Sequence, residues 1–143
     1  MAELTDKRLF LLDMDGTLYL DDDLFPGTVP FLRRIREKGG RYLFLTNNSS
    51  RGADSYVEKL RRLGIESVPE DFLTSVDALI LFLRKGDYQG KPLYVAGTES
   101  FRRQLRSAGF SVTSDREEAE VLICGFDTEL TFQKLEDACI LLN

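Results

Sequence analysis

The chain has 143 residues, of which 43% are hydrophobic and 30% are charged, a balance typical of a globular protein with a buried core. Its net charge of −5 disfavours a nucleic-acid-binding surface, and no apolar run approaches the ~20 residues that span a bilayer. The chain contains no histidine, which excludes imidazole bases, Ser-His and Cys-His catalysis and most zinc sites.

The first apolar run of the chain leads straight into aspartates without the small-residue cleavage site of a signal peptide. A cytoplasmic location is therefore expected, with neither a membrane nor nucleic acid as a partner. Cys124 and Cys139 both fall in apolar patterns, which are typical of small core residues and not of a disulfide framework.

Strand and helix patterns alternate along the whole chain, which predicts the α/β fold class. Residues 8–12 (RLFLL) are a short apolar run of the kind found in strands buried on both faces of a parallel sheet. The other expected strands are residues 42–45, 72–74, 93–96, 110–113 and 121–124. The expected helices run from Thr28 to Gly39, from Ala53 to Leu63 with caps at Asn48, Ser49 and Ser50, from Val76 to Leu83, from Glu99 to Ala108, and from Leu135 to the end. The glycine-rich segment 86–92 closes with a proline and predicts a boundary between a first domain, residues 1–86, and a second, residues 87–143.

Acidic and hydroxyl side chains follow the first two predicted strands at the point where each ends. Asp13 and Asp15 flank Met14 after the first strand, and Thr46 follows the second. Because the carboxyl ends of parallel strands share one edge of a sheet, these side chains should face one pocket. Two adjacent carboxylates repel each other unless a cation, a shared proton or a reaction offsets the cost.

This arrangement predicts phosphoryl chemistry. Loop amides near Gly16 and the start of the helix after Thr46 form an anion site, and Mg²⁺ bridges carboxylates to phosphate oxygens. Asp13 can then attack phosphorus and form an aspartyl-phosphate, while Asp15 protonates the leaving oxygen and deprotonates the attacking water. Thr17 is expected to orient Asp15, and the Thr46 hydroxyl to hold phosphoryl oxygens.

Two other functions compete with this interpretation. A signalling receiver domain also phosphorylates an aspartate at a strand end, but it places that aspartate after its third strand and a lysine after its fifth. A non-catalytic fragment that binds only a partner or ligand is the other. The turn-forming tendency of Asp and Gly would explain an isolated Asp-x-Asp-Gly, but not its agreement with the strand before it and the second strand end.

The motifs DMDGTLY (residues 13–19) and LTNNSS (residues 45–50) resemble the first two motifs of the haloacid dehalogenase superfamily of phosphatases, in particular its NagD-like or p-nitrophenyl phosphatase branch. The segments LDDDLFPGTVPFLRRIREKG and GFDTELTFQKLEDA also resemble that branch. The resemblance implies a partial Rossmann-like core with flanking helices, followed by the first part of an α/β cap domain. It implies that Asp13 is nucleophile and Mg²⁺ ligand, that Asp15 is acid/base and metal ligand through its backbone carbonyl, and that Thr46 and Asn47, with Gly16, bind the phosphoryl group of a small-molecule substrate. Asn48 and Ser49 also match the second motif.

The chain departs from the family pattern beyond its second motif. A phosphate-binding lysine and further acidic metal ligands are expected well downstream, and QGKP at residues 89–92 comes too early to supply the lysine. We therefore expect a chain truncated after the N-terminal part of the enzyme, with weak phosphatase activity by itself. An incomplete sheet also favours self-association or exchange of elements between chains.

Overall fold

The computed structural model describes residues 6–143, which form two compact units. Within the described residues, unit 1 comprises residues 6–46 and 53–73, and unit 2 comprises residues 47–52 and 74–143. The short segment 47–52 thus groups with unit 2, although both of its flanking segments belong to unit 1.

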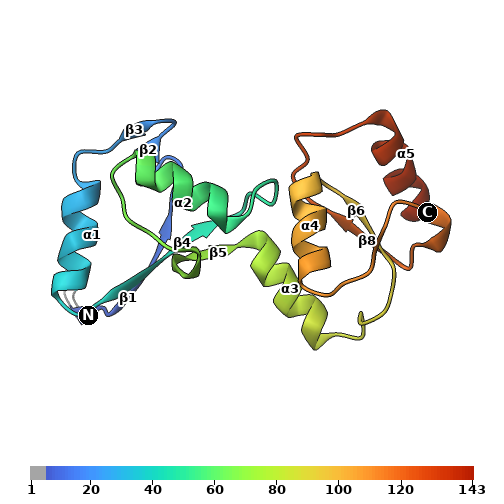
Figure 1. Cartoon of the computed structure of the whole chain (residues 1–143), viewed down its shortest axis with the longest axis horizontal. Coiled ribbons are helices and arrows are strands. Elements are labelled where there is room, and N and C mark those ends of the chain that lie inside the picture. Colours follow the sequence, from blue (N-terminus) through green and yellow to red (C-terminus); the bar gives the residue numbers. More distant parts are fainter. Residues whose placement is uncertain (1–5) are drawn as a thin grey trace. The chain divides into compact units, whose positions relative to one another are not determined.

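Unit 1 is built on a three-stranded sheet in the order β1-β4-β5 (Figure 1). Strand β1 (Leu9–Asp13) pairs in parallel with β4 (Arg41–Thr46), in a register that sets Leu9 opposite Arg41 and Asp13 opposite Leu45. Strand β5 (Phe72–Thr74) follows the short 3-10 helix η2 (Pro69–Asp71), and β2 (Tyr19–Leu20) and β3 (Asp23–Leu24) form a small antiparallel hairpin.

One face of this sheet is covered by helices α1 (Thr28–Glu37) and α2 (Ala53–Arg62). Their apolar stripes follow helical spacing, with Leu32 and Ile35 buried on α1 and Tyr56 and Leu60 buried on α2. These side chains pack with alternate residues of β4 because successive strand side chains point to opposite faces. The buried core of unit 1 consists of Met14, Leu18, Tyr19, Leu32, Ile35, Tyr42, Phe44, Tyr56, Leu60, Ile65 and Phe72.

The prediction that β1 is buried on both faces is wrong. Phe10 and Leu12 pack against the core, but Leu9 and Leu11 are each 57% exposed. Within residues 6–143 the core lies only on the sheet face that carries Phe10 and Leu12, so the opposite face of β1, with Leu9 and Leu11, is exposed. Strand β1 also stands at an edge of the sheet. A continuous apolar run therefore does not distinguish a doubly covered strand from an edge strand.

Unit 2 contains a parallel three-stranded sheet in the order β7-β6-β8, formed by Val112–Thr113, Leu93–Ala96 and Val121–Cys124. Its helices are α3 (Ser75–Lys85), α4 (Glu99–Ser107) and α5 (Phe132–Leu141), with a 3-10 turn η3 (Arg116–Glu118). Threonine side chains begin each helix, since Thr74, Thr98 and Thr131 accept hydrogen bonds from the amides of Asp77, Phe101 and Lys134. The parallel sheets and flanking helices confirm the predicted α/β class.

The second compact unit begins before the boundary predicted at residue 86, since it includes residues 74–86. Val76 and Leu83 of α3 lie in one core with Leu93 and Phe101, so α3 belongs to unit 2. Residues 86–92 connect α3 to β6 inside that unit. The assignment of the two parts as core and cap domains stays a prediction.

The cysteines also differ from expectation. Cys124 and Cys139 are both exposed free thiols, because each falls on the outward side of its element while Ile123 and Ala138 beside them are buried. Among residues 6–143, no helix combines the length and the hydropathy needed to cross a bilayer.

Candidate active site

The loop after β1 is held by Met14, whose side chain is buried in the core of unit 1. Its neighbours Asp13 and Asp15 are exposed, so the buried methionine turns both carboxylates to the surface. The turn is closed by backbone hydrogen bonds from Gly16 N to Tyr19 O at 2.8 Å and from Leu18 N to Met14 O at 2.9 Å. Gly16 has φ +77°, which strains any residue with a Cβ, so glycine suits this position.

The two aspartates have different partners. The Thr17 hydroxyl donates to Asp13 Oδ2 at 3.5 Å, whereas Lys59 Nζ lies 3.3 Å from Asp15 Oδ1. The sequence predicted that Thr17 orients Asp15, but in the structure Thr17 contacts Asp13 and a lysine contacts Asp15. The cation reduces the repulsion that two neighbouring carboxylates would otherwise suffer.

Lys59 also lies over an aromatic ring, with its ammonium 4.1 Å from the centroid of Tyr19. The Tyr19 side chain is fully buried, and its hydroxyl has no hydrogen-bond partner among residues 6–143. Burial raises the pKa of Tyr19, and the negative charges of Asp15 and Asp13 raise it further. The hydroxyl therefore stays protonated, and its ring presents a neutral face to the ammonium.

Thr46 ends β4, next to the position that pairs with Asp13, so the sheet brings these two predicted site residues to one edge. Its hydroxyl lies 3.3 Å from the hydroxyl of Tyr56 on α2. Tyr56 and Lys59 are three residues apart and share one face of that helix. Helix α2 thus carries Tyr56 to the end of β4 and Lys59 to the loop after β1.

Asn47 follows Thr46 but groups with unit 2, as does the rest of the segment 47–52. The expectation that Asn48, Ser49 and Ser50 cap the following helix is wrong, since α2 begins only at Ala53. Asn48 Oδ1 instead accepts from the amide and hydroxyl of Ser50, at 2.8 Å and 2.6 Å, as in an Asx turn.

The segment 47–52 is fixed within unit 2 by buried hydrogen bonds. Ser49 Oγ accepts from the amide of Phe126 at 2.8 Å, and Thr98 Oγ1 donates to Ser50 O at 3.0 Å. A Cβ at Gly125 would lie 2.6 Å from Ser49 Oγ, so only glycine permits this approach. Ser49, which matches the second motif, therefore has a structural partner of its own.

The exposed carboxylates at the end of β1 suit Mg²⁺ in chemical type, since this ion prefers hard oxygen ligands and uses one or two protein carboxylates together with waters and substrate phosphates. Within residues 6–143, no three His, Cys, Asp or Glu side chains are grouped so that they could hold a metal. Asp13 and Asp15 therefore do not form a closed metal cage with a third such side chain among the described residues.

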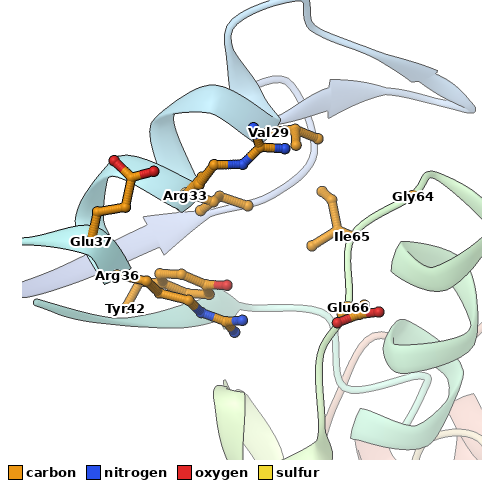
Figure 2. Close-up of a pocket in the computed structure, with 9 residues that line it drawn as sticks. Val29, Arg33, Arg36, Glu37, Tyr42, Gly64, Ile65 and Glu66 are labelled. Carbon is orange, nitrogen blue, oxygen red and sulfur yellow. The ribbon is translucent and has the colours of Figure 1, made fainter. Parts of the chain in front are cut away.

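A separate groove of about 340 Å³ lies in unit 1, between α1, the start of β4 and the loop after α2. Figure 2 shows Tyr42 and Arg36 on one side of this groove and Ile65 and Glu66 on the other. Arg36 stacks on the Tyr42 ring at 4.9 Å. The groove contains none of the predicted site residues, and Tyr42 is four strand positions, about 13 Å, from Thr46.

Residues 10–111 match the family model of haloacid dehalogenase-like hydrolases. The chain belongs to this family. The match spans both strand-end motifs, residues 13–19 and 45–50, and continues to residue 111 in unit 2.

Three relatives locate the chain within the family. It is 30% identical over 133 residues to an acid sugar phosphatase of Staphylococcus aureus, covering 93% of this chain and 51% of that protein. The structure of a 4-nitrophenylphosphatase from Thermotoga maritima has a TM-score of 0.88 and 39% identity, over 97% of this chain and 52% of the other. The structure of a glycerol phosphate phosphatase from Mycobacterium tuberculosis, solved with magnesium, has a TM-score of 0.88 and 26% identity, over 99% of this chain and 43% of the other.

These similarities confirm the expected branch of NagD-like and p-nitrophenyl phosphatases. The chain spans about half the length of the relatives it matches.

Lys59 and Tyr19 are two residues near the site that were not predicted from the sequence. Lys59 stands in the sequence as one of several charged residues on an amphipathic helix, which ordinarily face solvent. The one indication in the sequence is that Lys59 lies three residues after the buried Tyr56, which places both on one face of α2. That this face lies beside the loop after β1 is evident only from the structure.

Proposed function

We propose that the chain carries the nucleophile and the acid/base of a Mg²⁺-dependent phosphomonoester hydrolase that acts through an aspartyl-phosphate. The observation that carries this proposal is the juxtaposition at one edge of the sheet: Asp13 ends β1, Thr46 ends the paired strand β4, and both aspartates face outward. Membership of the haloacid dehalogenase-like hydrolases supports it.

In the proposed reaction, an Asp13 carboxylate oxygen attacks phosphorus and the bond between phosphorus and the ester oxygen breaks. Asp15 gives its proton to the leaving oxygen, which departs as an alcohol. Asp15 then takes a proton from water, whose oxygen attacks phosphorus and displaces the Asp13 carboxylate. The products are an alcohol and inorganic phosphate, and both aspartates return to their starting states.

The other predicted residues surround the phosphoryl oxygens or support the residues that do. The Thr46 hydroxyl and Asn47 bind them, Gly16 shapes the loop that faces them, and Thr17 restrains the nucleophile Asp13 through its hydrogen bond. Asp13 and the backbone carbonyl of Asp15 would hold Mg²⁺. When bound, the ion offsets the repulsion between the carboxylate nucleophile and an anionic substrate.

The substrate class follows from the names of the relatives, which refer to sugar phosphate, nitrophenyl phosphate and glycerol phosphate. All three are phosphomonoesters, so we propose a small phosphorylated molecule as the substrate. The family match favours a hydrolase over a receiver domain. Because the described residues group no third acidic ligand with Asp13 and Asp15, turnover by these 143 residues should be slow.

The proposal is tested by binding of beryllofluoride, which mimics a phosphoryl group on aspartate. The chain is titrated with beryllium and fluoride at millimolar Mg²⁺, and the bound species is followed by ¹⁹F nuclear magnetic resonance. We expect a bound signal that requires Mg²⁺ and disappears in Asp13→Asn. A non-catalytic fragment would give no bound signal, and a signal that persists in Asp13→Asn would assign the nucleophile to another residue.

A further inference from the structure

The contact between Lys59 and Asp15 differs from the other ion pairs of helix α2. Arg61 and Glu58 on the same helix pair at 2.9 Å, but their side chains are 73% and 50% exposed. The Lys59 side chain is only 17% exposed, although it pairs with an Asp15 that is 66% exposed. A mobile surface pair contributes little, whereas a cation withdrawn from solvent keeps a defined position.

Two contacts fix that position. The face of the Tyr19 ring lies 4.1 Å from the Lys59 ammonium, and this ring cannot move aside because it is fully buried in the core. The ammonium is therefore held on the side of the ring that faces the loop after β1. The second contact of the Lys59 ammonium is with Asp15 Oδ1 in that loop, at 3.3 Å.

The Asp15 carboxylate, by contrast, has little packing of its own. It is largely exposed, and the Thr17 hydroxyl contacts Asp13 and not Asp15. A solvent-exposed aspartate without a partner samples several rotamers, only some of which point toward a substrate oxygen. The contact with Lys59 Nζ, at 3.3 Å, therefore restrains the Asp15 carboxylate.

We propose that Lys59 is a positioning residue that holds the Asp15 carboxylate in place for proton transfer, with the buried Tyr19 ring fixing the lysine. This inference rests on the proposed function, because it assigns Lys59 to the acid/base of that reaction. Lys59 does not touch the phosphoryl group in this role. Its loss should therefore slow the steps in which Asp15 moves a proton and leave the phosphoryl site on Asp13 intact.

The experiment measures hydrolysis of the aspartyl-phosphate separately from occupation of Asp13. The 143-residue chain is phosphorylated with acetyl phosphate and Mg²⁺, freed of reagent, and assayed for the rate at which it loses phosphate. Beryllofluoride uptake is measured in parallel by ¹⁹F nuclear magnetic resonance. The variants are Lys59→Met, Lys59→Gln and Lys59→Arg, with Arg61→Met as the matched control that removes a cation and an ion pair from the same helix.

We expect Lys59→Met and Lys59→Gln to slow dephosphorylation about tenfold and to leave beryllofluoride uptake unchanged. The tenfold loss is smaller than the full contribution of a well-placed acid/base, because Asp15 itself is still present. Lys59→Arg should recover most of the rate because a guanidinium keeps the charge and stacks on the ring. Arg61→Met should behave as the unmodified chain. Lys59→Gln, which keeps a polar end, serves if Lys59→Met does not fold.

Two results would overturn the inference and leave the proposed function standing. The first is an unchanged dephosphorylation rate in both neutral variants. The second is a parallel loss of beryllofluoride uptake, which would make Lys59 a phosphoryl ligand instead. If the unmodified chain takes up neither beryllofluoride nor a phosphoryl group, the proposed function itself fails, and the role of Lys59 fails with it.

Discussion

Replacing Tyr19 with phenylalanine should make unit 1 more stable. The Tyr19 hydroxyl is buried and has no hydrogen-bond partner among residues 6–143, so folding removes it from water without compensation. A buried polar group left unpaired costs about 1–3 kcal/mol, and phenylalanine keeps the ring while removing that group. We expect the free energy of unfolding to rise by about 1 kcal/mol, the lower end of that range.

Tyr56→Phe is the matched comparison, since Tyr56 is a second buried tyrosine of the same core whose hydroxyl does have a partner in Thr46 at 3.3 Å. Its loss should lower stability by about 0.5–1.5 kcal/mol. Urea unfolding followed by circular dichroism, with amide hydrogen exchange in β4, measures both variants. A loss of stability in Tyr19→Phe as large as that in Tyr56→Phe would show instead that the Tyr19 hydroxyl has a hydrogen-bond partner in the folded protein.

Three further predictions concern unit 2. Lys134→Met should destabilise it by about 3 kcal/mol in urea unfolding, because Asp127, whose side chain is 6% exposed, loses the ammonium 2.9 Å away; an unaffected midpoint would contradict this. Ser49→Ala should speed hydrogen exchange at the amide of residue 126 by leaving that donor unpaired, while distant amides keep their rates. Hydrogen bonds from Tyr94 first, then from Gln133 and Arg116, hold the pKa of Asp137 below its ordinary value of 3.8. The contribution of Asp137 to the free energy of unfolding is therefore complete above pH 3.8 and is lost as the pH falls through the lower pKa of the folded state. The free energy of unfolding, measured over this acid range, should accordingly fall less with pH in Asp137→Asn than in the unmodified chain.

The sequence predicted the order and type of the main elements because their patterns are local. The apolar stripe of α2 and the short runs at β4 and β6 set the period of each element, and the glycines after the helices set where they end. Asp13 and Thr46 could be placed at one sheet edge because parallel pairing of consecutive strands follows from that alternation.

What the sequence could not predict depends on contacts between distant residues. The exposure of Leu9 and Leu11 depends on which sheet face is covered, and a run of apolar letters does not contain that information. The Ser49 hydroxyl, expected to cap a helix, instead accepts from the amide of Phe126, 77 residues away, and the Ser50 backbone carbonyl accepts from Thr98, 48 residues away. The pairing of Lys59 with Asp15 likewise joins residues 44 positions apart.

The proposed reaction requires a covalent bond between Asp13 and phosphorus. It is tested most directly by treating the chain with acetyl phosphate and Mg²⁺, reducing the product with borohydride, and locating the modified residue by peptide mass spectrometry. Borohydride converts an aspartyl-phosphate to homoserine. We expect homoserine at position 13 and unmodified aspartate at position 15, whereas homoserine at position 15, or at neither position, would show that Asp13 is not the nucleophile.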